Sequence, residues 1–130
     1  MERTRVRVVL LGVIAVVAFD AVASVVSRST GIPYDWATYG SWFLYTVFGY
    51  LAGRASPATP LKSAALAGVI FGLADATLGW ATSWALGQGR VPGGVSIVQW
   101  SFVAAIVTLL AIGFAALGGS FARMRNSRKR

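Results

Sequence analysis

Four long apolar stretches, separated by short polar breaks, dominate the pattern along this chain. The stretches cover about residues 6–26, 36–53, 63–86 and 95–117. At about 1.5 Å per helical residue, each one is long enough to cross a hydrocarbon core of about 30 Å. The pattern therefore predicts an all-α membrane protein with four transmembrane helices.

The polar breaks have the composition of tight connections. They read SRSTGIPYD, RASPATPLK and GQGRVPGG, and each carries the Gly or Pro residues that end a helix and turn the chain. Because the breaks are too short to fold as domains, we expect a single four-helix unit over residues 1–130. A short basic tail at residues 120–130 closes it.

Composition supports the membrane class, and the positions of the basic residues predict an orientation. The chain is 56% hydrophobic and only 12% charged, whereas soluble domains are about 25% charged. All twelve Lys and Arg residues except Arg28 and Arg90 lie on the side of the two termini and the middle break. Cytoplasmic loops carry such an excess, so both termini are expected in the cytoplasm, in a plasma membrane or bacterial inner membrane.

The same distribution explains the net charge of +8 without a nucleic-acid partner. The basic tail has a second interpretation, because a Lys or Arg near an anionic bilayer gains about 1 kcal/mol from the surface potential. The candidates for contact with anionic lipid are Arg123, Arg125, Arg128, Lys129 and Arg130. The alternative is that these residues only set the topology, and the lipid bilayer is the expected partner in both cases.

The N-terminal stretch MERTRVRVVLLGVIAVVAFDAVA also has the layout of a cleavable signal peptide, with a basic start, an apolar centre and a small-x-small ending. Asp20 interrupts this layout just before the cleavage position, and apolar sequence continues through Val26. We therefore expect a retained span, with cleavage as the alternative.

The residue types that are missing argue against an enzyme. The chain has no Cys and no His, and its only acids are Glu2, Asp20, Asp35 and Asp75. Thiolate and imidazole chemistry are therefore excluded, and no phosphate-binding or dinucleotide-binding glycine motif is present. We expect no catalytic residues, no metal site and no cofactor.

Two acids lie inside apolar stretches. Asp20 and Asp75 each fall about twelve residues, or roughly 18 Å, from the cytoplasmic start of their helix. They are therefore expected at equal depth, just beyond the bilayer midplane. Because an acid that faces lipid near a helix centre costs about 2.5 to 3.5 kcal/mol, both should face protein or a water-filled crevice.

Helical spacing predicts the neighbours of each acid. Asp20 shares a face with Ser24 and Ser27, and Asp75 shares one with Thr82 and the glycines Gly68, Gly72 and Gly79. Either the pair handles protons or cations, or each protonated acid binds a neighbouring helix and contributes about 0.6 to 2 kcal/mol. Asp75 is the stronger candidate, since small residues on its face would leave room for water or an ion.

Small residues also predict close helix packing. Gly49 and Gly53 form a GxxxG pair in the second stretch, and Gly68, Gly72 and Ala76 recur every four residues in the third. Such rows let helix backbones approach closely. They are compatible with packing within one chain and with a homo-oligomer.

The two halves of the chain are similar enough to suggest a repeat. GVIAVVAFDAVAS in the first stretch and GVIFGLADATLG in the third both place Asp-Ala after Gly-Val-Ile, with one residue of slippage. Two repeated helical hairpins would result, with Asp20 and Asp75 as equivalent positions. Chance similarity is the alternative.

All five Trp residues fall in the outer halves of the second, third and fourth stretches. An interfacial aromatic belt is the expected explanation, and rings that line an outward-facing pocket are the alternative. The five are Trp36, Trp42, Trp80, Trp84 and Trp100.

Residues 48–70, FGYLAGRASPATPLKSAALAGVI, resemble a pattern found in uncharacterised small bacterial four-helix integral membrane proteins. The resemblance implies an architecture and no activity. The expected function is that of a non-enzymatic accessory or interaction subunit of a larger membrane complex. The alternative is a small homo-oligomeric transporter or channel, coupled to protons or cations, that uses Asp20 and Asp75.

Overall fold

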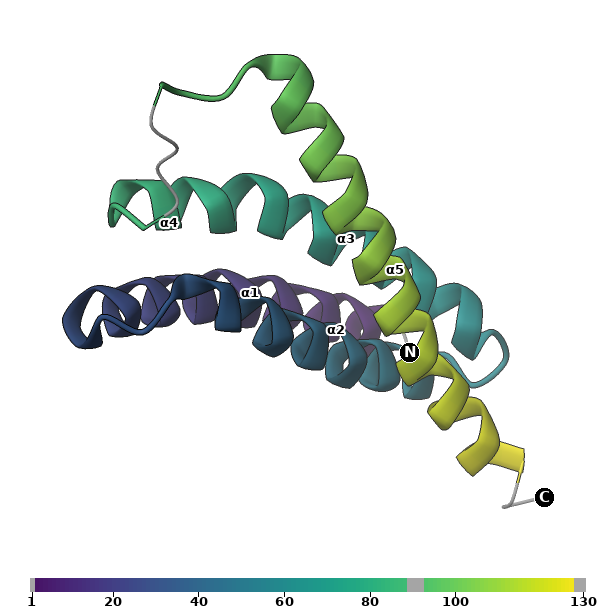
Figure 1. The fold of residues 1–130 in the computed structure, drawn as a ribbon. Coiled ribbons are helices and arrows are strands. Elements are labelled where there is room, and N and C mark those ends of the chain that lie inside the picture. Colours follow the sequence, from purple (N-terminus) through teal and green to yellow (C-terminus); the bar gives the residue numbers. More distant parts are fainter. Residues whose placement is uncertain (1, 89–92, 128–130) are drawn as a thin grey trace.

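The computed structural model describes residues 2–88 and 93–127, and within these ranges it contains helices and no strands (Figure 1). Helix α1 (Glu2–Thr30) is followed by a short 3₁₀ turn, η1 (Tyr34–Trp36), and by α2 (Ala37–Arg54). A third rod is continuous through α3 (Pro60–Ala74), the π-helix η2 (Asp75–Gly79) and α4 (Trp80–Ala85). The last helix is α5 (Ile97–Ser127).

Three of the described helices are long and apolar enough to cross a membrane: Glu2–Thr30, Pro60–Ala85 and Ile97–Ser127. Helix α2 has 18 residues but is less apolar, because Tyr, Thr, Ser, Gly and Trp alternate with its aliphatic residues and Arg54 ends it. The all-helical class is thus confirmed, whereas α2 as a fourth span stays a prediction.

The helices are longer than the apolar stretches that predict them. Helix α1 begins at Glu2 and ends at Thr30, and α5 continues to Ser127, through most of the predicted basic tail. Arg and Ser do not stop a helix that is already formed, so hydropathy marks only its apolar centre.

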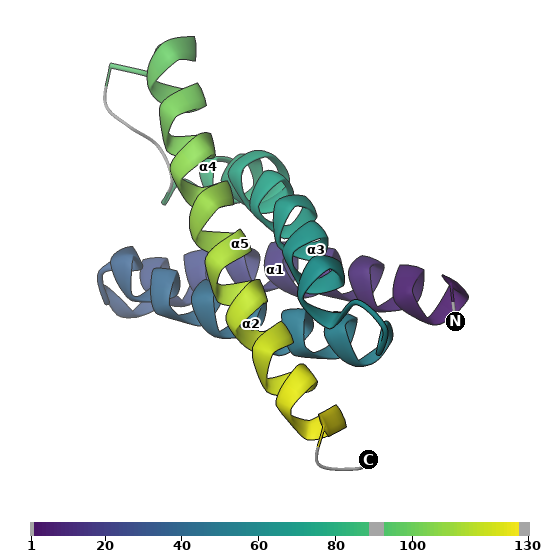
Figure 2. The ribbon, with the colours of Figure 1, turned by 90° about the vertical axis from the view of Figure 1, so that its right-hand side faces the viewer.

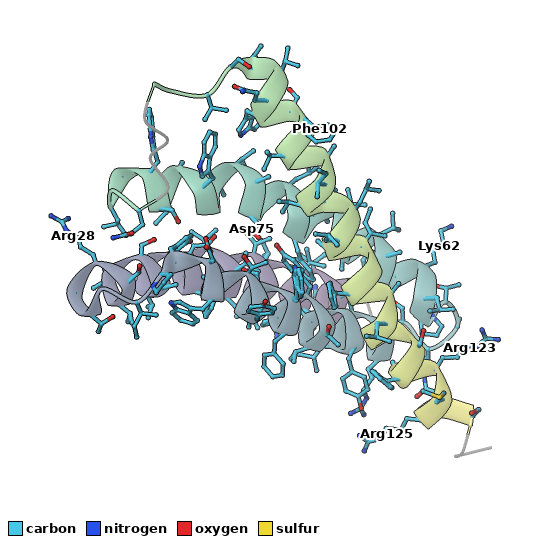
Figure 3. All side chains as sticks on the ribbon, in the orientation of Figure 1. Arg28, Lys62, Asp75, Phe102, Arg123 and Arg125 are labelled. Atoms are coloured by element: carbon cyan, nitrogen blue, oxygen red, sulfur yellow. The ribbon has the colours of Figure 1, made fainter. Side chains whose placement is uncertain are left out.

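The first three rods lie alongside one another, and α5 crosses them obliquely (Figures 1 and 2). The N-terminus, the α2–α3 turn and the C-terminal end of α5 lie at one end of the molecule. Figure 3 places Lys62, Arg123 and Arg125 at that end and Arg28 at the other, with Asp75 between them. The chain is therefore less regular than an evenly packed four-helix bundle.

Glycines bring α5 into contact with α2 and α3. A Cβ atom added to Gly49 would meet the backbone of Ala115, and one added to Gly72 would stand 2.5 Å from the Thr108 Cα. On the same rows, a Cβ at Gly68 would stand 2.7 Å from the Ile112 Cα, and one at Gly53 would stand 3.1 Å from the Ala122 Cβ and 3.2 Å from the Gly119 Cα. Ala76, at the end of the α3 row, is buried.

The C-terminal part of α5 is packed and its N-terminal part is not. Ala111, Ala115 and Ala122 are fully buried, whereas Ile97 and Phe102 are 79% and 67% exposed. Among the described residues, α5 packs against α2, α3 and η2 but not against α4. The divergence of α5 from α4 leaves the interior accessible between them.

Candidate functional site

The two carboxyl groups that lie within the apolar stretches meet inside the molecule. Asp20 on α1 and Asp75, the first residue of η2, converge beside Gly79. Gly79 makes the approach possible: a Cβ added there would collide with Asp20 Oδ2 and stand 2.8 Å from Asp75 Oδ1. Asp20 is only 4% exposed, and Asp75 is half-buried.

This proximity limits the charge that the pair can hold. An ionised carboxylate only accepts hydrogen bonds, so a bond between two carboxyl groups requires a proton on one of them. Two full negative charges at this separation would also repel strongly in a medium of low dielectric constant. The arrangement therefore suits one shared proton and one negative charge.

Two tyrosine hydroxyls donate to the pair from opposite sides. Tyr45 on α2 donates to Asp75 Oδ2, and Tyr34 in η1 donates to Asp20 Oδ1 at 3.2 Å. Tyr45 is fully buried. Burial raises the pKa of the Tyr34 hydroxyl, so this group keeps the proton that it donates.

Two serines continue the hydrogen-bond chain behind Tyr34. The hydroxyls of Tyr34 and Ser83 are 2.7 Å apart, and Ser24 donates to Ser83 at 3.2 Å. If Ser83 donates to Tyr34, every hydroxyl in this chain points its proton toward Asp20. Ser24 and Ser83 are both buried, whereas Tyr34 is only partly buried.

The π-helix decides which residue of α4 joins the network. The Trp80 N–H donates to the Asp75 carbonyl, five residues earlier, so η2 holds one residue more than an α-helical turn would. Regular α-helical spacing places Thr82 on the Asp75 face, but the extra residue moves Ser83 there instead. Thr82 donates to the Leu78 carbonyl at 2.7 Å and lies outside the network.

Ser27 has a different role from the one its spacing predicts. It donates to the Ile32 carbonyl at 2.6 Å and to Gln88 Oε1 at 3.5 Å. It therefore joins the α1–η1 connection to the end of α4, at the outer margin of the carboxyl network.

The carboxyl pair lies in the wall of a cavity of about 320 Å³. The polar residues of the wall are Asp20, Tyr34, Thr38, Ser41, Tyr45, Asp75 and Ser83. The rest is apolar, and it includes three of the five Trp residues, Trp42, Trp80 and Trp100. The pocket interpretation of the tryptophans thus describes these three rings, whereas a belt stays a prediction for Trp84, which is 55% exposed.

The rings of this wall are held by neighbours. Trp42 stacks on Phe114 with ring centroids 4.9 Å apart, and Trp100 Nε1 donates to the Ala76 carbonyl at 3.2 Å. The second contact crosses from α5 to the π-helix at the point where α5 diverges from the bundle. The aromatic wall is therefore attached to the same segment that carries Asp75.

Gly68, Gly72 and Gly79 were expected to leave room for water or an ion beside Asp75. The backbone of α5 fills the space at Gly68 and Gly72, and the Asp20 carboxyl fills it at Gly79. The room beside Asp75 comes instead from the cavity on the other side of η2. Asp20 and Asp75 share this cavity, so the structure ranks neither acid above the other.

Basic residues are remote from the carboxyl pair where the structure describes them. Arg28 is exposed near the C-terminal end of α1, and Arg90 lies outside the described residues. Near the C-terminal end of α5, Arg123 is exposed and Arg125 donates to the Tyr50 hydroxyl at 2.9 Å. The other predicted lipid contacts, Arg128, Lys129 and Arg130, also lie outside the described residues.

Tyr34, Tyr45 and Ser83 were missed by the sequence analysis. A usable signal existed for Tyr45, because a phenol in the middle of an apolar stretch needs a hydrogen-bond partner at that depth.

Within the described residues, no three acidic, His or Cys side chains gather as a metal site would require. No protein-family model, curated protein or solved structure matches the chain.

Proposed function

We propose that this chain is a non-enzymatic integral membrane protein that binds a proton or another cation at Asp20 and Asp75 and carries it as a small transporter or channel. The observation that carries the proposal is the convergence of two buried carboxyl groups in the wall of a cavity. Intramembrane acids that face a cavity mark ion and proton pathways. A purely structural role, in which a protonated acid forms a hydrogen bond to a neighbouring helix, would require only one acid and no cavity.

The membrane arrangement belongs to the same proposal. We place α2 as the fourth span, since its 18 residues measure about 27 Å and it packs between the other helices. Both termini then lie in the cytoplasm, in a plasma membrane or bacterial inner membrane. In this arrangement the cavity lies toward the outer surface, since it is lined by Tyr34 of the α1–α2 connection and by Val95, just before α5.

Infrared difference spectroscopy of the purified chain tests this proposal. We expect a carboxyl band that changes with pH between about 5 and 9 or on addition of a cation, and that is lost in both Asp20→Asn and Asp75→Asn. The amide keeps the shape of the side chain but cannot ionise. Asp35→Asn is the matched control, because Asp35 is exposed in η1.

Uptake into liposomes completes the test. Asp20→Asn and Asp75→Asn should each abolish cation-dependent flux, whereas Asp35→Asn should retain it. Carboxyl groups that never respond to pH or to any cation, together with unchanged flux in both variants, would leave only a structural role for the pair. Because four helices enclose little volume, we expect the active form to be a homo-oligomer.

An accessory subunit is the second candidate, and one observation favours it. The outer part of α5 is exposed on nearly every side, with Ile97, Val98 and Phe102 all more than two-thirds exposed. A helix of a larger complex could pack there. Site-specific photocrosslinking from Phe102 in native membranes tests this candidate: a crosslink to a different membrane protein supports it, and crosslinks to lipid alone contradict it.

A further inference from the structure

We propose that the cation bound in this cavity is an organic ammonium ion with an apolar body. The inference rests on the proposed function and names its substrate class. It comes from the uneven distribution of polar and apolar groups over the cavity wall, which a small inorganic cation would not use.

The side-chain oxygens of the cavity wall come from α1, η1, α2 and the third rod, and none comes from α5. They belong to Asp20, Tyr34, Thr38, Ser41, Tyr45, Asp75 and Ser83. An inorganic cation prefers oxygen ligands around most of its surface. Here it would meet carbon along the part of the wall that is built from Val95, Val103, Val107 and Leu110.

Aromatic rings also line the cavity. Trp42, Trp80 and Trp100 each contribute to the cavity wall. The face of an indole ring attracts an ammonium group, and quaternary ammonium ions are commonly bound in cages of such rings. Rings together with carboxylates form a site that can hold a cation without surrounding it with oxygens.

The charge of the carboxyl pair and the volume of the cavity both fit an organic ammonium ion. A carboxyl pair with one shared proton carries a single negative charge, which matches one ammonium group. The cavity of about 320 Å³ is far larger than a bare metal ion needs, and it lies at the lower end of the range for small-molecule pockets. The apolar body would lie against the valines of α5, where that helix diverges from α4.

Binding of benzyltrimethylammonium to the purified full-length chain tests the inference, measured by calorimetry and by tryptophan fluorescence. The decisive control is neopentylbenzene, in which carbon replaces the nitrogen and the shape is kept. We expect the ammonium ion to bind and to alter the fluorescence. Equal binding of the uncharged isostere would overturn the inference, because binding would then depend on the shape of the ligand and not on its charge.

Variants at two positions of the same helix provide a matched comparison. Trp80→Leu should weaken binding of the ammonium ion about tenfold, and Trp80→Phe should restore part of it, since a phenyl ring retains the cation–π attraction. Trp84→Leu should have little effect, because Trp84 does not line the cavity. Equal affinities for all three variants would contradict a role for the Trp80 ring.

Failure of this inference can be separated from failure of the proposed function. If the infrared carboxyl band responds to pH or to sodium but benzyltrimethylammonium does not bind, the substrate class is wrong and the cation site stands. If no proton, sodium or ammonium response occurs, the cation site itself is wrong.

Discussion

The hydroxyl of Tyr45 reaches Asp75 from a helix of modest hydropathy, and its removal isolates one bond of the carboxyl network. Tyr45→Phe should shift the infrared carboxyl band of Asp75 and lower the stability of the folded chain by about 0.6 to 1.7 kcal/mol, the range for hydrogen bonds between membrane helices. Tyr39→Phe is the control, because Tyr39 is 69% exposed on the same helix. An unchanged band in Tyr45→Phe would show that this bond does not act on Asp75.

Ser83 and Thr82 are adjacent in sequence but differ in their contacts. Ser83→Ala should break the chain from Ser24 to Tyr34 and weaken cation binding several-fold. Thr82→Ala should leave binding unchanged, since its hydroxyl bonds only to its own helix. Binding titrations of the two variants check this, and a larger loss in the Thr82 variant would indicate that the third rod is a regular α-helix in solution.

At the scale of the helices, contacts of α2 and α3 with α5 depend on glycine. A Cβ at Gly118 would collide with the Thr46 carbonyl and stand 2.6 Å from the Tyr50 nitrogen, whereas nothing lies within 4 Å of a Cβ at Gly113. Gly118→Ala should therefore destabilise the chain by about 1 to 3 kcal/mol, and Gly113→Ala should not. Thermal unfolding in detergent compares them, and equal melting temperatures would argue against the α2–α5 contact.

The helices could be predicted from the sequence more fully than their arrangement could. Apolar stretches of sufficient length require helices in lipid, and equal distances of Asp20 and Asp75 from the basic ends implied that the acids could meet. The register beyond Asp75 could not be obtained, because a π-helix depends on packing against α1 and α5 and not on local periodicity. The oblique course of α5 could not be predicted either, since hydropathy contains no information about the angles at which helices cross.

The membrane topology of the whole molecule depends on whether α2 crosses the membrane. If α2 crosses the membrane, the chain has an even number of spans and its termini share one side; if it does not, they lie on opposite sides. We expect reporter fusions at residue 130 and near Pro57 to be cytoplasmic and one near Arg90 to be external, with a retained N-terminus in the mature protein. An external C-terminus would reject both the fourth span and the proposed orientation of the cavity.

The π-helix has a consequence for how the chain tolerates a deletion. A π-helix of this length holds one residue more than a regular α-helical turn. Removal of Leu78, which is 55% exposed, would convert Asp75–Gly79 to regular α-helix and still leave Ser83 in register with Asp75. This segment should therefore tolerate the loss of one residue better than its place in the middle of the third rod suggests.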